Sequence, residues 1–205
     1  MKFKVNLNWH ICKPNRFRTL FDYKTKPKKE KDFNIEGKYH RSFYQCDLCN
    51  HICAYHGFKT NNLYDEDYLN LTYKDMSGIS KRFNQIISLP ISKSDNKNRA
   101  QRVDKFLGKK FNILDVGCGT GVFLYEMKKK GHNVKGLDLD KRYANFLLGK
   151  KIKVFVKELN KITTKKKFNL ITFNKVLEHI QDPLQQLKDA KKFLTKNGII
   201  YIEVP

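Results

Sequence analysis

The sequence lacks any long apolar run. Hydrophobic residues make up 40% of the chain, but no stretch approaches the roughly 20 consecutive apolar residues that a membrane-spanning helix needs. The first residues, MKFKVNLNWHICKPN, also lack the continuous apolar segment of a secretory signal. These absences predict a cytoplasmic protein without membrane contact. The length of 205 residues is enough for one domain and a small appendage.

Arginine is scarce in a strongly basic chain. The formal net charge is +22, yet only seven of the 42 basic residues are arginine, and the lysines are scattered along the whole sequence. Proteins that read RNA usually combine basic residues with exposed aromatic side chains or a known module, and we find no such module. The charge therefore does not predict a nucleic-acid partner, and an RNA-directed function is kept only as an alternative.

Cysteines are few, and four of the five lie within residues 1–57. In a reducing compartment they are expected to be metal ligands or buried small residues rather than disulfides. Cys46 and Cys49 have the C-x2-C spacing that directs two thiolates at one zinc ion. Cys12 is the candidate for a further ligand, although its own C-x2-C motif is incomplete. Weaker candidates are His10, Cys53 and His56. The alternative is a segment that has lost its metal and folds by packing its aromatic side chains.

The most informative stretch is residues 111–140, FNILDVGCGTGVFLYEMKKKGHNVKGLDLD. An apolar run leads to Asp115, three glycines follow at alternate positions, helical spacing comes next, and a second apolar run ends at Asp138. The glycines are Gly117, Gly119 and Gly121. The order predicts strand, tight turn, helix and strand, the first half of a nucleotide-binding α/β sheet. An acid that ends the second strand lies where ribose hydroxyls are bound. The spacing is not the G-x-G-x-x-G of dinucleotide-binding proteins.

The rest of the chain continues the same alternation. Helical spacing predicts helices over 80–89, 97–107, 141–148 and 183–194. Apolar runs predict further strands over 152–156, 168–173 and 199–204. We therefore expect an α/β fold with a Rossmann-like, mostly parallel sheet flanked by helices. The predicted divisions are a zinc-ribbon-like segment over 1–57, a helical connector over 58–96, and a cofactor-binding domain over 97–205.

The acid followed by G-x-G-x-G resembles motif I of the class I S-adenosylmethionine-dependent methyltransferases. The resemblance implies that Asp115 and the three glycines shape the loop around the methionine part of S-adenosylmethionine. It implies further cofactor contacts by four residues: Asp138 to the ribose, Leu139 to adenine, Glu158 at the adenine edge and Asn174 near the methionine end. The alternative for Asp138 is a helix N-cap. The alternative for Glu158 is a solvated turn acid.

A narrower resemblance rests on VLEHIQDPLQQL, the amino-terminal cysteines, the stretch 94–99 and the ending YIEVP. Together these are similar to the branch with a small zinc-type domain ahead of the methyltransferase domain. Members of that branch include C-methyltransferases of nucleotide-linked sugars. The resemblance therefore implies zinc as a second cofactor and a small-molecule acceptor such as a nucleotide-linked sugar.

Methyl transfer from a sulfonium needs alignment, and a base only where the acceptor must lose a proton. Glu178 and His179 follow the strand predicted over 168–173 and are the expected acid-base pair. The alternative is that His179 only packs in its loop. The family's sheet has seven strands, and five are predicted here. We therefore expect a C-terminally truncated methyltransferase, or one whose sheet a partner chain completes. A cofactor-binding fragment without catalysis is the alternative of another class.

Overall fold

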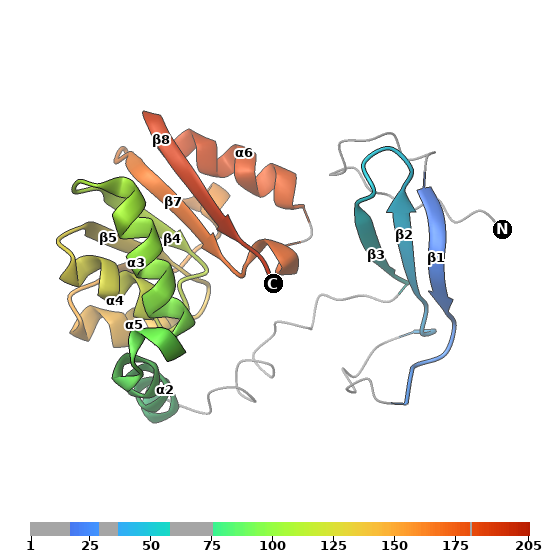
Figure 1. Cartoon of the computed structure of the whole chain (residues 1–205), viewed down its shortest axis with the longest axis horizontal. Helices are drawn as coiled ribbons and strands as arrows, with labels where there is room; N and C mark the ends of the chain where they lie inside the picture. Colours follow the sequence, from blue (N-terminus) through green and yellow to red (C-terminus); the bar gives the residue numbers. More distant parts are fainter. Residues whose placement is uncertain (1–16, 29–36, 58–75, 181) are drawn as a thin grey trace. The chain divides into compact units, whose positions relative to one another are not determined.

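The computed structural model describes residues 17–28, 37–57, 76–180 and 182–205 (Figure 1). The chain divides into two compact units, residues 1–72 and 73–205. Cys12 and His10 lie outside the described residues. The boundaries predicted at residues 57 and 96 stay predictions.

The described part of the first unit is a three-stranded antiparallel sheet in the order β1-β2-β3. Its strands are β1 (Phe17–Tyr23), β2 (Arg41–Cys46) and β3 (Ile52–His56). The turn from β2 to β3 contains the C-x2-C pair. It is closed by two hydrogen bonds of 2.9 Å, from Asn50 N–H to the Cys46 carbonyl and from Cys46 N–H to the His51 carbonyl. The backbone therefore holds Cys46 and Cys49 on one tight turn.

The second unit is built on a five-stranded parallel sheet, which confirms the predicted α/β fold. Its strands are β4 (Asn112–Val116), β5 (Asn133–Leu137), β6 (Lys153–Phe155), β7 (Phe168–Asn174) and β8 (Leu194–Glu203). The order in space is β6-β5-β4-β7-β8. The chain thus steps outward from β4 to β6 and then returns to the other side of β4. The carboxyl ends of β4 and β7 flank this reversal, where open α/β sheets bind their ligands.

Helices cover both faces of the sheet (Figure 1). The bounds are α2 (Met76–Ser88), α3 (Asp95–Leu107), α4 (Val122–Lys129), α5 (Lys141–Gly149) and α6 (Pro183–Phe193). Because side chains alternate along a strand, Ile113 joins the core under α3 and α4, and Leu114 joins the core under α6. Helix α2 packs on α4 and α5 through Phe83, whose ring contacts Tyr125 and Phe146. No helix among the described residues is both long and apolar enough to cross a membrane.

Side chains cap the first turns of α3 and α6. The Ser94 hydroxyl accepts the Lys97 N–H at 3.4 Å and begins α3. Asp182 accepts the Gln185 N–H at 2.8 Å and begins α6, with Pro183 in the first turn. Both arrangements satisfy backbone donors that a helix start leaves unpaired.

The prediction was wrong at one junction. A strand was expected from residue 199, after a helix ending at Leu194, but β8 begins at Leu194 itself. Leu194 pairs with Phe168 and Ile199 pairs with Leu170, so the residues between them form an irregularity in the ladder. Leu194 is extended and still packs into the core under α6. Its apolar position in the sequence therefore could not distinguish the last turn of a helix from the start of a strand.

Candidate functional site

The glycine turn after β4 is fixed to the end of β5. The N–H groups of Gly117 and Cys118 both donate to the Leu137 carbonyl, at 2.8 and 3.1 Å. Gly117 and Gly119 have positive φ, 68° and 50°, which side chains disfavour. A Cβ on Gly117 would lie 2.6 Å from Cγ2 of Val176, whereas a Cβ on Gly119 would meet nothing within 4 Å. The turn therefore packs against the segment after β7 and leaves the backbone of Gly119 open to a ligand.

Asp138, the first residue after β5, binds the other side of this turn. Its Oδ2 accepts the Gly119 N–H at 2.8 Å, and its Oδ1 accepts the Asp140 N–H at 3.1 Å. Burial raises the pKa of Asp138. The N-cap of α5 is Asp140, so the alternative reading of Asp138 as that cap is wrong. Each carboxylate oxygen can accept a further hydrogen bond. Leu139 beside it is 68% exposed and offers an apolar surface to a ligand.

Asp115 is a buried carboxyl group shared between β4 and β7. Its Oδ1 accepts the Thr172 hydroxyl at 2.6 Å and the Asn174 Nδ2 at 2.8 Å. Burial raises the pKa of Asp115 to about 7, although the two hydrogen bonds act in the opposite direction. Oδ1 of Asn174 is buried and has no hydrogen-bond partner among the described residues. An unpaired buried acceptor is costly unless a ligand supplies the donor.

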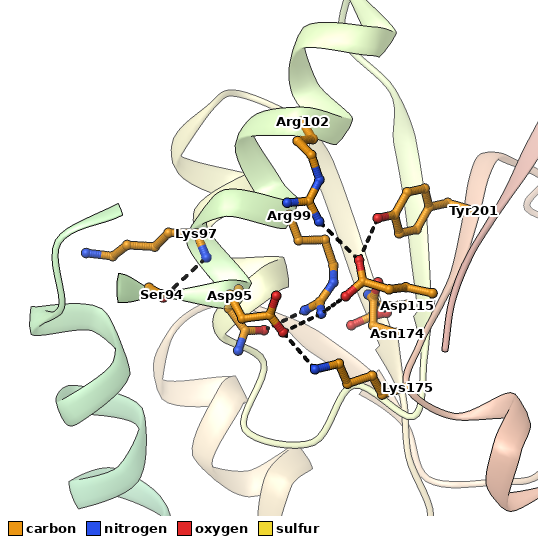
Figure 2. A network of polar contacts seen from close by, with 11 residues as sticks. Ser94, Asp95, Lys97, Arg99, Arg102, Asp115, Asn174, Lys175 and Tyr201 are labelled. Carbon is orange, nitrogen blue, oxygen red and sulfur yellow. Dashed lines mark hydrogen bonds and ion pairs between the residues drawn. The ribbon is translucent and has the colours of Figure 1, made fainter. Parts of the chain in front are cut away.

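An ionic network surrounds this carboxyl group and joins α3 to β8 (Figure 2). The Arg99 guanidinium, 3% exposed, donates to Asp95 at 2.8 Å and to Glu203. The Glu203 carboxylate also accepts the Tyr201 hydroxyl at 2.7 Å. The hydrogen bond from Arg99 is the largest influence on Glu203 and lowers its pKa to about 2. Lys175 completes the network with a 3.0 Å contact to Asp95.

The sequence alone does not indicate this network. The stretch 94–99 and the ending YIEVP supported a family resemblance, but nothing in the sequence shows that Arg99 and Glu203 meet. The one sequence feature that points to the network is Glu203. It lies on the face of β8 that is turned toward α3, where an apolar residue is expected. A buried acid implies a buried base.

Glu178 and His179 lie in η3 (Leu177–His179), beyond the carboxyl end of β7. His179 Nε2 is 4.0 Å from Glu178 Oε1, and the side chains are 50% and 22% exposed. Glu178 and His179 lie near the glycine turn, because Val176, which precedes η3, packs against Gly117. At 4.0 Å their side chains do not form a close ion pair. Their acid-base role stays a prediction.

Glu158, which follows β6, is half-exposed and pairs with Lys161 at 2.9 Å. It lies at the same edge of the sheet as Asp138, since the Asp138 N–H donates to the Phe155 carbonyl at 3.1 Å. Its contact with the cofactor stays a prediction.

The cysteines of the first unit are only partly described. Cys46 is buried and Cys49 is exposed, and neither forms a disulfide with another described residue. No group of three metal-ligating side chains occurs in the described part of the chain. Burial raises the pKa of Cys53 to about 11, and nearby Cys46 and Cys49 act in the same direction. The zinc prediction, with Cys12 as a further ligand, stays a prediction.

A family model described as a methyltransferase domain matches residues 81–205, more than half of the chain. The chain belongs to the class I S-adenosylmethionine-dependent methyltransferases. The zinc-type branch and the truncation stay predictions.

Two similar curated proteins are O-methyltransferases by name. The chain is 35% identical over 100 residues to the ubiquinone biosynthesis O-methyltransferase of Pelagibacter ubique, covering 46% of this chain and 42% of the relative. It is 30% identical over 116 residues to that of Actinobacillus pleuropneumoniae, covering 49% and 47%. The chain thus spans less than half the length of these relatives.

Solved structures share the fold. A TehB-like S-adenosylmethionine-dependent methyltransferase from Corynebacterium glutamicum superposes with a TM-score of 0.52 at 22% identity, over 62% of this chain and 71% of the other. CalS10, an amino pentose methyltransferase from Micromonospora echinaspora solved with S-adenosylmethionine bound, gives 0.50 at 16% identity, over 62% and 56%.

The residues present fit S-adenosylmethionine. The space over Gly119 is open, Asp138 offers carboxylate oxygens, and the buried Oδ1 of Asn174 requires a donor. An adenosine group with ribose hydroxyls and a methionine group with an ammonium supply the complementary chemistry.

The raised pKa of Asp115 predicts a pH dependence of stability. An acid with a higher pKa in the folded than in the unfolded chain stabilises the fold while protonated. That contribution is complete below the usual 3.8 and is lost as the pH rises through about 7. Asp115→Asn keeps a neutral acceptor and avoids this loss. Stability is compared as the free energy of unfolding of the variant minus that of wild type. We expect this difference to increase between pH 4 and 7, by on the order of a few kcal/mol.

The measurement is urea unfolding followed by far-ultraviolet circular dichroism at several pH values. Leu148→Ala, an uncharged change at a 64% exposed position, is the control and should show a pH-independent difference. A flat difference for Asp115→Asn would contradict the assignment.

Proposed function

We propose that this chain binds S-adenosylmethionine at the reversal between β4 and β7 and transfers its methyl group to an oxygen atom of a small molecule. The observation that carries the proposal is the glycine turn, open over Gly119 and hydrogen-bonded at that same residue to Asp138. This arrangement lies within the segment that the methyltransferase family model matches.

Each part of the cofactor has a complementary group on the chain. Asp138 accepts hydrogen bonds from the ribose hydroxyls. Leu139 packs against adenine, and Glu158 lies at the adenine edge. Gly117, Gly119 and Gly121 let the backbone approach the methionine part. The free Oδ1 of Asn174 accepts from the ammonium, while Asp115 orients the Asn174 amide through the 2.8 Å bond.

Bound S-adenosylmethionine supplies a methyl group activated by its sulfonium, so that the C–S electron pair leaves with sulfur as an acceptor oxygen bonds to the methyl carbon. The chain aligns the two reactants and excludes water. A hydroxyl acceptor must also lose its proton, and Glu178 and His179 are the groups beyond β7 that can take it.

An oxygen acceptor is favoured because the curated relatives that share 30–35% identity are named O-methyltransferases. A nucleotide-linked sugar is the other acceptor that the sequence predicts, and it forms a second arm of the test below. The cytoplasmic location also stays a prediction of the sequence.

The first test is cofactor binding. Asp138→Asn weakens the acceptor of the ribose hydroxyls, and we expect S-adenosylhomocysteine to bind about tenfold more weakly, the value of one charge-assisted hydrogen bond. Isothermal titration calorimetry on the full chain measures this. Asp182→Asn, which changes a carboxylate that accepts a backbone N–H at the start of α6, is the matched control and should bind normally. Wild-type protein that binds neither cofactor form at millimolar concentration would refute the proposal.

The second test is methyl transfer from radiolabelled S-adenosylmethionine to hydroxyl-bearing precursors of ubiquinone, the class suggested by the names of the relatives, to nucleotide-linked sugars and to RNA. We expect labelled product with the hydroxyl-bearing precursors, and we expect His179→Asn or Glu178→Gln to reduce kcat about 10²-fold or more if the group is the base. Affinity for S-adenosylhomocysteine should not change in these variants. Binding without transfer to any acceptor would instead favour the non-catalytic cofactor-binding module.

We also infer that the first unit holds one zinc ion through Cys46, Cys49 and Cys12. Support comes from the closed turn, in which two 2.9 Å backbone bonds hold the C-x2-C pair. Elemental analysis of the full chain should give about one zinc per chain. Cys46→Ser with Cys49→Ser should remove it, and Cys118→Ser, at a buried thiol in the other unit, should not. Metal-free wild-type protein purified without chelators would contradict this assignment.

A further inference from the structure

Lys175, the residue directly after β7, has an unusual backbone conformation. Its φ is 56°, in the left-handed region that glycine and asparagine tolerate better than lysine. Lys151 has the same φ, but it follows α5, where a left-handed residue is an ordinary helix end. At Lys175 the conformation directs the backbone N–H to the Glu203 carbonyl at 2.7 Å and turns the chain into η3.

Stability does not account for a lysine at this position. Its ammonium is 3.0 Å from Asp95 Oδ2, and the two side chains are 49% and 53% exposed. Ion pairs of this exposure contribute little. Asp95 has a second partner, since the buried Arg99 donates to it at 2.8 Å, so Asp95 keeps a counter-ion when Lys175 turns away. A glycine would relieve the backbone strain and lose only this weak pair.

The place of Lys175 indicates what its side chain can do. On one side of it Asn174 is bonded to Asp115, and on the other Val176 packs against Gly117. Lys175 therefore lies at the rim of the crevice between the carboxyl ends of β4 and β7. Figure 2 shows its ammonium directed at Asp95. Three cations, Arg99, Arg102 and Lys175, share two carboxylates, Asp95 and Glu203.

We propose that Lys175 is a specificity-determining residue whose ammonium exchanges Asp95 for an anionic group, a carboxylate or phosphate, of the methyl acceptor. The assignment rests on the proposed function, because it places the acceptor beside the methionine end of the cofactor. Lysine suits this exchange, since its ammonium is a mobile point charge with three donors. Asp95 holds the ammonium at the rim until the acceptor arrives, while Arg99 keeps Asp95 in position.

The test uses two probes of similar shape, benzoate and uncharged benzamide. The ¹⁵N-labelled full chain, saturated with S-adenosylhomocysteine, is titrated with each probe, and amide shifts of residues 95, 175 and 176 are followed. We expect saturable benzoate binding about tenfold tighter than benzamide binding, the value of one charge-assisted hydrogen bond. Lys175→Met and Lys175→Gly should abolish the preference, and Lys175→Arg should retain it. Lys129→Met, at an exposed lysine paired with Glu126 on α4, is the matched control and should also retain it.

The two proposals fail in different ways. If wild-type protein does not bind S-adenosylhomocysteine, the proposed function is refuted, and the role of Lys175 with it. If it binds but shows no benzoate preference, or if Lys175→Met retains the preference, the role of Lys175 alone is refuted. Competition with inorganic phosphate distinguishes the two anionic groups. If the site prefers phosphate, phosphate should displace benzoate at a concentration below that of the added salt. If the site prefers a carboxylate, it should not.

Discussion

The site depends on one buried carboxyl group that two adjacent strands share. Asp115 on β4 receives hydrogen bonds from Thr172 and Asn174 on β7, at the point where the strand order reverses. A carboxylate removed from water is costly unless it is hydrogen-bonded. The two bonds therefore fix the relative positions of the strand ends, and with them the turn that follows β4 and the residues that follow β7. The proposed contacts of the glycine turn, Asn174 and Lys175 follow from that placement.

The charges around Asp115 form a second layer that stabilises the first. Arg99 is nearly inaccessible to water and acts on Asp115, Asp95 and Glu203 together. Removing one member of such a network leaves a buried charge uncompensated, which costs far more than the network contributes as a whole. The arrangement therefore specifies one geometry at the rim of the site more than it adds stability. The exposed pair of Lys175 and Asp95 is the part of this layer that can rearrange without that cost.

Local sequence signals predicted the elements of the second unit and the tight glycine turn after β4. Alternating glycines after an acid, helical spacing and apolar runs are short-range features, and they placed the parallel sheet and five helices. Two features were beyond such signals. Leu194 packs into the same core as helix or strand, so its conformation depends on pairing with Phe168. Arg99 and Glu203 meet only because the strand order brings β8 beside β7, and sequence spacing carries no record of that.

The contact between Arg99 and Glu203 also constrains the order of events during synthesis. Its partners are 104 residues apart, and α3 emerges from the ribosome long before β8. Until β8 docks, the Arg99 guanidinium has no carboxylate from the sheet and remains hydrated, which opposes closure of α3 over β4 and β7. Contacts of such large sequence separation form late and slow folding. The nascent chain can therefore assemble β4, β5 and the glycine turn early, yet the ionic network around Asp115 is complete only when β8 is added.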